Sequence, residues 1–246
     1  MSLETPAGHV GLVTGASGGI GRAVACGLAD AGARVALGYG RSREQADRVA
    51  EEIAHAGGEA WPVGADLADP EAPAAQVAAV IGRFGRLDLL VCNAGVGERR
   101  DWPDVTLDDW ERAMAVNLRA PFLAAQAALP GMVERGFGRI LFVSSLAAFT
   151  GGLVGPHYAA SKAGLHALTA FLAGRVAAAG VTVNAVAPAL IENTGMLPGA
   201  TAELAARVPV GRLGRPEEVA DLALAMLRNP YLTGKVVLLD GGMHPR

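Results

Sequence analysis

The amino-acid sequence predicts an α/β fold in which a doubly wound, seven-stranded parallel sheet is covered by helices on both faces. Short runs rich in Val, Leu and Ile alternate along the chain with Ala-rich segments of helical periodicity. Most of the runs do not alternate polar and apolar residues, which is typical of strands buried on both faces. Strands and helices that alternate in this way form parallel sheets with right-handed crossovers. A chain of 246 residues suits one core, so we expect a single domain over residues 1–246.

The apolar runs define the expected strands, which are 9–14, 33–38, 59–64, 87–91, 139–144, 181–186 and 235–239. The Ala-rich segments define the expected helices, which are 19–31, 42–56, 70–83, 107–134, 157–179 and 215–228. In the second of these helices, Val49 and Ile53 lie on one face and the pair Glu51 and Glu52 on the other. That division is expected of a helix that packs on a sheet.

The composition argues against several classes of partner. The formal net charge is −3 and the basic residues are dispersed, so there is no basic stripe for a nucleic acid. Cys26 and Cys92 stand among apolar neighbours, which predicts reduced thiols, and the five His show no metal-ligand spacing. The first ten residues lack a signal-peptide pattern, and no apolar run is long enough to span a membrane. We therefore expect a cytoplasmic protein without nucleic-acid, membrane or metal partners.

The stretch TGASGGIG, residues 14–21, connects the first expected strand to the first expected helix. Gly15 allows a tight turn off the strand, Gly19 lets the backbone approach a pyrophosphate, and Gly21 lets the helix sit close to the sheet. The N-terminus of the helix then faces the anion. The spacing differs from the G-x-G-x-x-G fingerprint, and a plain glycine-rich turn is the alternative interpretation.

Tyr158 and Lys162 are four residues apart in an expected helix and therefore share one face. A nearby ammonium favours phenolate and lowers the pKa of a tyrosine, whose reference value of about 10 is too high for acid–base work at neutral pH. Ser145, at the end of an expected strand, is placed to orient a substrate oxygen. Taken singly, each is also explained as an ordinary helix-surface or strand-end residue. Together they predict a general acid, a cation that tunes it and a second hydrogen-bond donor.

Several short motifs occur in an order that resembles the short-chain dehydrogenase/reductase family. They are TGASGGIG at 14–21, Asp66 in GADL, CNAG at 92–95, Asn117 in MAVNL, Ser145 in VSS, YAASK at 158–162 and LDGG at 239–242. The resemblance covers nearly the whole chain and implies a Rossmann fold and an NAD(P)-dependent oxidoreductase. The nearest general pattern is that of the 3-oxoacyl-(acyl-carrier-protein) reductases, through PVGRLGRPEEVA at 209–220 and the ending LDGGM.

The resemblance implies catalytic roles for Asn117, Ser145, Tyr158 and Lys162. Tyr158 would donate its proton to a carbonyl oxygen as hydride arrives from the nicotinamide, and Ser145 would hydrogen-bond the same oxygen. Lys162 would also hold the nicotinamide ribose, and Asn117 would fix a water beside it in a proton relay, which requires an inward-facing side chain. The cofactor residues that the resemblance implies are Gly15, Ser17, Gly19, Ile20, Gly21, Asp66, Leu67, Asn93, Ala94, Gly95, Pro188, Ile191 and Thr194, with Tyr158 and Lys162.

The end of the second expected strand bears on the choice between NADP(H) and NAD(H). Relatives that prefer NAD carry Asp at the position of Tyr39, and here Arg41 and Ser42 follow closely. A guanidinium and a hydroxyl suit the 2′-phosphate of NADP better than a bare ribose, so we expect NADP(H) to be preferred. Gly18 is a contrary sign, because many NADP-preferring relatives carry a basic residue there. Arg41 is also explained as a solvated charge at a helix start.

The segment from 188 to about 210 is expected to cover the substrate. An apolar wall is expected from Leu146, Phe149, Leu153, Val154, Leu190, Met196 and Leu197. Such a wall favours a hydrophobic ketone or acyl chain, although the same residues also suit packing of the fold. The expected activity is reduction of a small-molecule carbonyl compound, free or bound to a carrier protein or coenzyme A. The alternatives are an NAD-dependent alcohol dehydrogenase and a catalytically silent dinucleotide-binding protein.

Assembly is the last expectation. Relatives form tetramers through the helices that correspond to 107–134 and 157–179 and through the C-terminal strand. The Ala-rich face of 157–179 is suited to burial against a copy of itself, so we expect a homotetramer.

Overall fold

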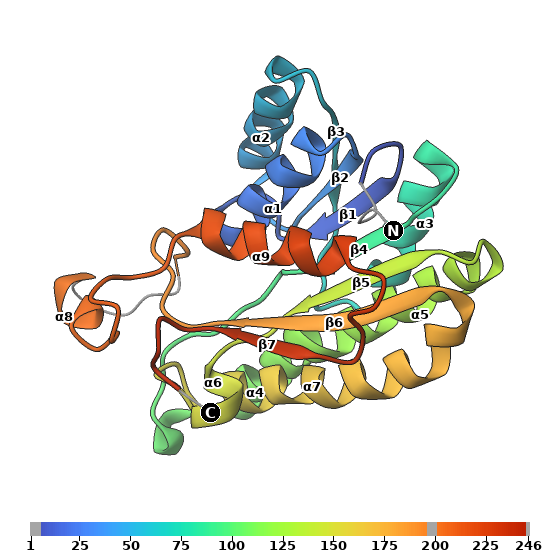
Figure 1. Cartoon of the computed structure of the whole chain (residues 1–246). Coiled ribbons are helices and arrows are strands. Elements are labelled where there is room, and N and C mark those ends of the chain that lie inside the picture. Colours follow the sequence, from blue (N-terminus) through green and yellow to red (C-terminus); the bar gives the residue numbers. More distant parts are fainter. Residues whose placement is uncertain (1–5, 196–200, 245–246) are drawn as a thin grey trace.

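The computed structural model describes residues 6–195 and 201–244. A seven-stranded sheet runs through its centre in the order β3-β2-β1-β4-β5-β6-β7, and every neighbouring pair is parallel (Figure 1). The strands are β1 Val10–Thr14, β2 Arg34–Tyr39, β3 Glu59–Gly64, β4 Leu89–Cys92, β5 Gly138–Val143, β6 Val181–Pro188 and β7 Val236–Leu239. The predicted Rossmann fold is confirmed, and each strand lies within about two residues of its predicted bounds.

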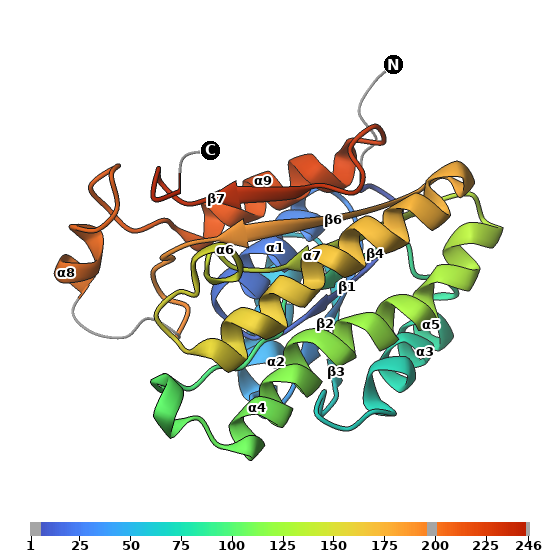
Figure 2. The same ribbon diagram turned by 90° about the horizontal axis from the view of Figure 1, so that it is seen from below.

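Helices cover both faces of the sheet, as predicted. They are α1 Gly19–Asp30, α2 Arg43–His55, α3 Ala72–Phe84, α4 Leu107–Met114, α5 Ala120–Glu134, α6 Ala147–Thr150, α7 Pro156–Val176, α8 Thr201–Ala205 and α9 Pro216–Arg228. One apolar core forms where α1, α2 and α9 pack on the sheet, and a second forms under α3, α5 and α7 (Figures 1 and 2). The central strands β1, β4, β5 and β6 are buried along their whole length between these helices, whereas the edge strands β3 and β7 are only partly covered.

The predicted helix 107–134 is interrupted, and this corrects the sequence interpretation. A π-helical turn, Ala115–Arg119, separates α4 from α5, and the N–H of Ala120 bonds to the carbonyl of Ala115 instead of the residue four earlier. Pro121 has no N–H to donate to the carbonyl of Asn117, so the regular hydrogen-bond ladder cannot continue past this point. The shift turns Asn117 towards the protein interior, where it is fully buried.

The sheet topology creates a crevice at the carboxyl ends of the central strands. The chain passes from β1 to β2 and β3 on one side, then crosses back to β4 on the other side of β1. The loops that follow β1 and β4 therefore diverge, and ligands of open α/β sheets bind where this happens. The register pairs Thr14 with Cys92 and Cys92 with Phe142, so β1, β4 and β5 end at nearly the same level.

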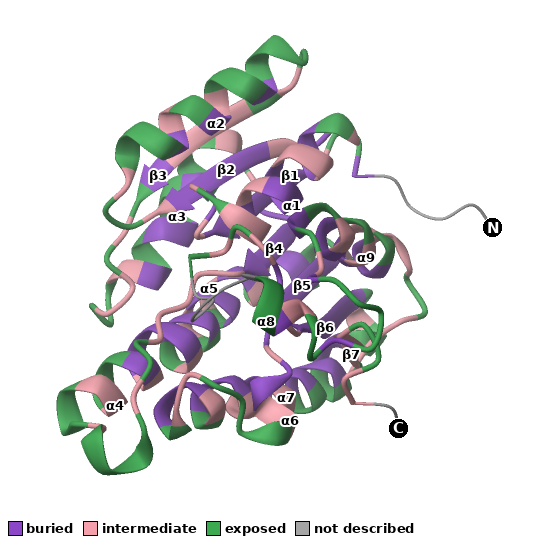
Figure 3. Cartoon of the chain, turned by 90° about the vertical axis from the view of Figure 1, so that its left-hand side faces the viewer, coloured by how far each residue is buried: buried purple, intermediate pink, exposed green. Residues whose placement is uncertain are grey.

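Short elements that the sequence did not predict lie around this edge. They include α6, α8 and the 3-10 turn η1 at Trp102–Asp104, each too short to show a helical period. Figure 3 shows the buried strands in purple with α8 in front of them. Within the described ranges, none of the helices has the length and apolar character needed to cross a bilayer.

Candidate active site

The glycine turn after β1 is held in a conformation that only small residues permit. Gly15 has φ +67°, and a Cβ there would lie 2.9 Å from the Cα of Ala94. A Cβ on Gly21 would collide with the carbonyl oxygen of Gly15 and lie 2.5 Å from Nδ2 of Asn93. Gly21 therefore allows α1 to start directly against the glycine turn. The sequence predicted that Gly21 brings the helix close to the sheet, and in the structure its close contact is with the turn.

Asn93 and Thr14 fasten this turn to the loop after β4. Nδ2 of Asn93 donates to the carbonyls of Thr14 and Gly15 at 3.0 and 3.1 Å. In return, Oγ1 of Thr14 accepts the backbone N–H groups of Asn93 and Ala94 at 3.1 and 3.0 Å. These four bonds fix the width of the crevice, so Asn93 shapes the site in addition to its predicted place beside the cofactor.

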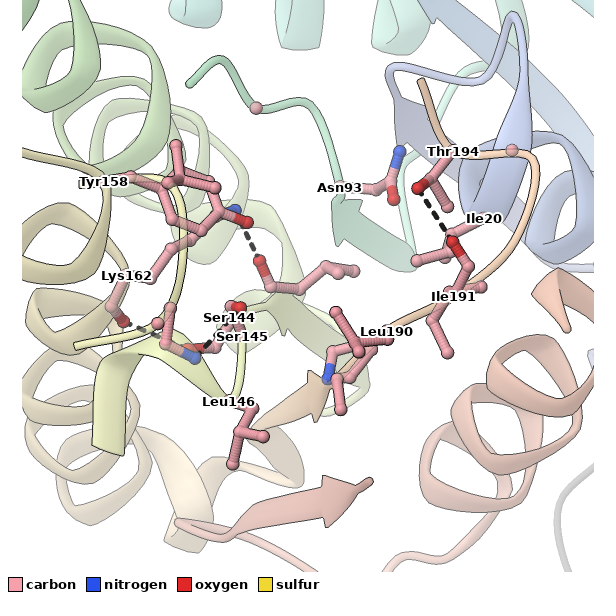
Figure 4. A pocket seen from close by; sticks show the side chains of 18 of the residues that line it. Ile20, Asn93, Ser144, Ser145, Leu146, Tyr158, Lys162, Leu190, Ile191 and Thr194 are labelled. Carbon is pink, nitrogen blue, oxygen red and sulfur yellow. Dashed lines mark hydrogen bonds between the residues drawn. The ribbon is translucent and has the colours of Figure 1, made fainter. Parts of the chain in front are cut away.

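The predicted catalytic residues meet at the other end of the crevice. Tyr158 and Lys162 lie one turn apart on α7, and both line the larger cavity of the crevice together with Ser145 (Figure 4). The Ser145 oxygen also accepts the backbone N–H of Ala147 at 3.1 Å. Nζ of Lys162 lies 5.8 Å from the centre of the Tyr158 ring and donates to the carbonyl of Val143 at 2.7 Å.

Burial dominates the electrostatics of this pair. Desolvation lowers the pKa of Lys162 from 10.5 to about 8. Desolvation also raises the pKa of Tyr158, and the hydrogen bond with Ser145 opposes that rise. The direction is opposite to the one expected from the neighbouring ammonium, because both groups are more than nine-tenths buried and the loss of hydration outweighs the attraction. The prediction that Lys162 brings the pKa of Tyr158 down is corrected accordingly.

Asn117 faces inward, as its predicted role in a relay requires. Its Oδ1 accepts the N–H of Val96 at 2.8 Å, and its Nδ2 donates to the Val96 carbonyl at 2.8 Å and to Oγ of Ser161 at 3.0 Å. Oγ of Ser161 in turn donates to the carbonyl of Tyr158 at 2.8 Å. Asn117 therefore ties the loop after β4 to the helix that carries Tyr158.

Two cavities follow the crevice, and they share Gly15, Ala94 and Gly95. The larger has a volume of about 540 Å³, and its lining includes these predicted residues: Gly15, Ser17, Gly19, Ile20, Asn93, Ala94, Gly95, Ser145, Tyr158, Lys162, Pro188, Ile191 and Thr194. The smaller has a volume of about 390 Å³, and its lining includes Gly15, Arg41, Asp66, Leu67, Ala94 and Gly95. The structure thus gathers most of the predicted site along one continuous depression.

Some predicted site residues do not line either cavity. Gly21 and Asn117 act on the walls from behind, through the contacts described above. Ser42 occupies the N-cap position of α2 and makes no capping hydrogen bond with its side chain. Asp66 lines the smaller cavity and also accepts the N–H of Ala68 at 3.1 Å, a local turn bond that precedes α3 by several residues.

The apolar wall is formed in part. Leu146, Leu153, Val154 and Leu190 line the larger cavity. Phe149 does not line it, which corrects its predicted place in the wall: its ring packs against that of His166, with the ring centres 4.7 Å apart and the planes tilted by 41°. Met196 and Leu197 lie outside the described residues.

The sequence interpretation missed several lining residues. Gln45, Arg207 and Met243 line the larger cavity, and Gln76 and Arg112 line the smaller one. They come from α2, the segment after α8, the C-terminal segment, α3 and α4, so only the folded arrangement brings them together. The described residues hold no cluster of His, Cys, Asp or Glu suited to a metal ion.

The crevice fits a dinucleotide. The first N–H groups of a helix lack partners within it, and α1 begins at the glycine turn, where Gly18 and Gly19 line the larger cavity. The close approaches at Gly15 and Gly19 keep side chains out of this space, since Cβ atoms there would lie 2.9 Å from Ala94 and 3.3 Å from Thr194. Gly15, Ser17, Gly19 and Ile20 would therefore hold the pyrophosphate, and Arg41, Asp66 and Leu67 the adenosine end.

Comparisons with known proteins agree with this geometry. Residues 9–205 match the family described as short chain dehydrogenase. The chain is 38% identical over 239 residues to 3-oxoacyl-(acyl-carrier-protein) reductase of Synechocystis sp., covering 96% of each chain. It is 39% identical over 245 residues to L-rhamnose 1-dehydrogenase (NAD(P)(+)) of Sphingomonas sp., again covering 96% of each. A blue fluorescent protein from a metagenomic library, solved in complex with NADPH, superposes with a TM-score of 0.92 at 36% identity, covering 98% of this chain and 100% of that one.

Proposed function

Because the chain belongs to the short-chain dehydrogenase/reductase family of oxidoreductases, we propose that it is an NADP(H)-dependent ketoreductase that reduces a hydrophobic ketone to a secondary alcohol. One observation carries the proposal: Tyr158 and Ser145 line the larger cavity together, with Lys162 one helical turn from Tyr158. A substrate oxygen placed between the two hydroxyl groups meets two hydroxyl donors at once.

The proposed chemistry assigns one task to each side chain. A reduced nicotinamide bound in the larger cavity would supply the hydride for the carbonyl carbon. Tyr158 donates its phenolic proton to the carbonyl oxygen, which becomes the hydroxyl of the product. Ser145 donates a hydrogen bond to the same oxygen, while the N–H of Ala147 fixes the serine oxygen from behind. Lys162, as the ammonium, stabilises the phenolate that remains.

The raised pKa of Tyr158 favours the reductive direction. Burial keeps the phenol protonated at neutral pH, which is the form that gives a proton to a carbonyl oxygen. Oxidation of an alcohol needs the phenolate instead, so it would require a higher pH. A rate of reduction that exceeds the rate of oxidation at neutral pH, measured with saturating cofactor in each direction, is the expected result.

Two guanidinium groups support NADP(H) over NAD(H). Arg41, after β2, and Arg112, on α4, both line the smaller cavity, where Asp66 is the one carboxylate among the described lining residues. Tyr39 packs on Gly64 at the position where NAD-preferring relatives carry Asp. The relative solved with NADPH supports the same choice. Fluorescence titration of both cofactors tests it, and tighter binding of NADH would overturn it.

The proposed substrate is a β-ketoacyl compound or a similar hydrophobic carbonyl, free or bound to a carrier protein or coenzyme A. Leu146, Leu153 and Leu190 line the larger cavity beside Ser145, and none of its described lining residues is acidic. The name of the Synechocystis relative supports an acyl substrate. A panel of β-keto esters, acyl thioesters and cyclic diketones, with NADPH oxidation as the readout, separates these classes.

We propose a homotetramer as the assembly. Phe171 on α7 is 59% exposed and Phe122 on α5 is 37% exposed, and all of β7 is only half-buried at the edge of the sheet. Burial of these apolar groups against further copies would remove them from water. Light scattering at micromolar protein concentration tests this, and a monomer would contradict it.

The direct test of the chemistry is Tyr158→Phe. We expect kcat for ketone reduction to fall by about 10²- to 10⁴-fold, since general acid catalysis contributes that much. The affinity for NADPH should stay within about twofold, because the ring itself is kept. Tyr231→Phe is the matched control, because Tyr231 is 97% exposed and lines neither cavity. Near-normal turnover by Tyr158→Phe would refute the assignment of the acid.

A further inference from the structure

Ser144, the residue before Ser145, has a buried hydroxyl that the proposed chemistry does not use. Its backbone N–H donates to the carbonyl of Val186 at 2.8 Å, and the residue is 3% exposed. Its Oγ donates to the carbonyl of Lys162 at 3.1 Å and lies 2.8 Å from Nε2 of His166. Both partners belong to α7 and lie one turn apart, and one of them is the backbone of the catalytic lysine.

A proton count identifies the donor in the contact between Ser144 and His166. A serine hydroxyl has one proton, and here it points to the Lys162 carbonyl, which has none to give. Both contacts are hydrogen bonds at once when Nε2 of His166 donates to Oγ of Ser144. A neutral imidazole protonated on Nε2 meets this requirement, and burial lowers the pKa of His166, which favours the neutral form.

His166 also contacts the segment that follows Ser145. The centre of its ring lies 4.7 Å from that of Phe149 on α6. The same short helix begins at Ala147, whose N–H donates to the Ser145 hydroxyl. His166 therefore touches both flanks of Ser145, by a hydrogen bond to Ser144 on one side and by a ring contact on the other (Figure 4 shows Ser144 and Ser145 side by side).

We propose that His166 is a positioning residue that holds the segment 144–147 against α7 and so sets the distance between the Ser145 hydroxyl and the Tyr158 phenol. The effect on turnover rests on the proposed function. The strand end is tied to α7 by the bond from Nζ of Lys162 to Val143 and by the two contacts of the Ser144 hydroxyl, to the Lys162 carbonyl and to His166. Replacement of His166 removes the last of these, which is the one tie that holds the Ser144 hydroxyl through a side chain.

The expected consequence is a loss of turnover without a loss of binding. His166→Leu removes the donor and keeps an apolar side chain, and we expect kcat to fall by about 10- to 100-fold, since a misplacement of about 1 Å has effects of that order. The KM for the ketone and the affinity for NADPH should stay within about twofold, because His166 lines neither cavity. His166→Gln keeps an N–H donor of similar reach and should restore kcat to within about threefold of the wild type.

Thr169→Val is the matched control on the same helix. It removes the bond from Oγ1 of the fully buried Thr169 to the carbonyl of Leu165, which does not reach the strand end. We expect kcat to stay within about twofold of the wild type even if the melting temperature falls. If Thr169→Val and His166→Leu lowered kcat equally, His166 would have only a structural role, and the proposal would be overturned.

Ser144→Ala tests whether His166 acts through this hydroxyl. Ser144→Ala also removes the bond to the Lys162 carbonyl. Combined with His166→Leu, it should lower kcat no further than the larger single loss, because both changes remove the same contact between Ser144 and His166. Losses that multiply in the double variant would overturn the proposal. So would a His166→Gln enzyme that is no better than His166→Leu.

A measurement without turnover separates this inference from the proposed function. ¹⁵N NMR of the imidazole rings, with His166→Gln to assign the signal, should give a neutral His166 protonated on Nε2 at neutral pH. Ser144→Ala should then speed exchange of that proton with water. A ring protonated on Nδ1 alone would overturn the inference. A wild-type enzyme that reduces no carbonyl in the panel would overturn only the proposed function.

Discussion

Lys162→Met should change how the stability of the fold depends on pH. The wild-type side chain is buried, with 3% of the residue exposed, and its ammonium donates to the carbonyl of Val143 at 2.7 Å. No carboxylate among the described residues pairs with it, and burial lowers its pKa from 10.5 to about 8. The fold therefore holds this proton less firmly than the unfolded chain does.

The sign and the size of the effect follow from these two values. Between about pH 8 and 10.5 the unfolded chain binds the proton more tightly than the folded one, so stability rises with pH through this window. Each pKa unit corresponds to about 1.4 kcal/mol, and integration from pH 7 to pH 10 gives a gain of about 2–3 kcal/mol from this one residue. Burial raises the pKa of Cys92 to about 12 and that of Tyr158 above its usual value, so both stay largely neutral in the fold.

Urea unfolding at pH 7 and pH 10 measures the effect. The free-energy difference between wild type and Lys162→Met should shift by about 2–3 kcal/mol in favour of the wild type at the higher pH. The sequence contains one other lysine, the exposed Lys235, and Lys235→Met should follow the wild type at both pH values. A difference between wild type and Lys162→Met that is the same at both pH values would refute the reasoning.

Two further substitutions test the walls of the crevice. Asn117→Ala leaves the N–H and carbonyl of Val96 without partners, so we expect a loss of about 2–4 kcal/mol and a fall in melting temperature of about 6–12 °C by calorimetry. An unchanged melting temperature would show that these bonds do not contribute to stability. Gly21→Ala should weaken NADPH binding by about tenfold, because the new Cβ collides with the glycine turn. Gly82→Ala, where a Cβ meets nothing within 4 Å, is its control, and equal NADPH affinities in the two variants would contradict the argument.

The strands could be predicted closely because burial on both faces requires a run of Val, Leu and Ile, and such a run is recognised directly in the sequence. The helix from 107 to 134 could not, because its interruption depends on contacts far away in sequence. Pro121 marks a weak point in the hydrogen-bond ladder, but Pro is also common in the first turn of a helix. The bonds between Asn117 and Val96, which the interruption serves, connect residues 21 positions apart.

The candidate site likewise contains some residues that could be predicted from the sequence and others that could not. Residues in compact motifs, such as Tyr158 with Lys162 or the glycine turn, could be placed because their spacing along one helix or turn determines where they lie. Gln45, Arg112 and Arg207 could not, because each reaches a cavity only through the packing of its helix or loop on the sheet. Ser42 was predicted from its neighbour Arg41, yet only Arg41 lines the smaller cavity, since adjacent residues at a helix start point in different directions.

The pKa shifts of Tyr158 and Lys162 could not be predicted from the spacing of the two residues alone. In water a lysine ammonium and a tyrosine phenol have similar pKa values, near 10. Burial separates them, because it destabilises the charged form of each, which is the ammonium of Lys162 and the phenolate of Tyr158. Lys162 thus becomes the stronger acid of the two. In the proposed reduction, a phenolate formed when Tyr158 gives up its proton is a stronger base than the Lys162 amine. Return of a proton from Lys162 to Tyr158 is therefore favourable. The neutral Lys162 amine then takes up one proton from solvent, so that each turnover restores both groups to the forms that the next carbonyl requires.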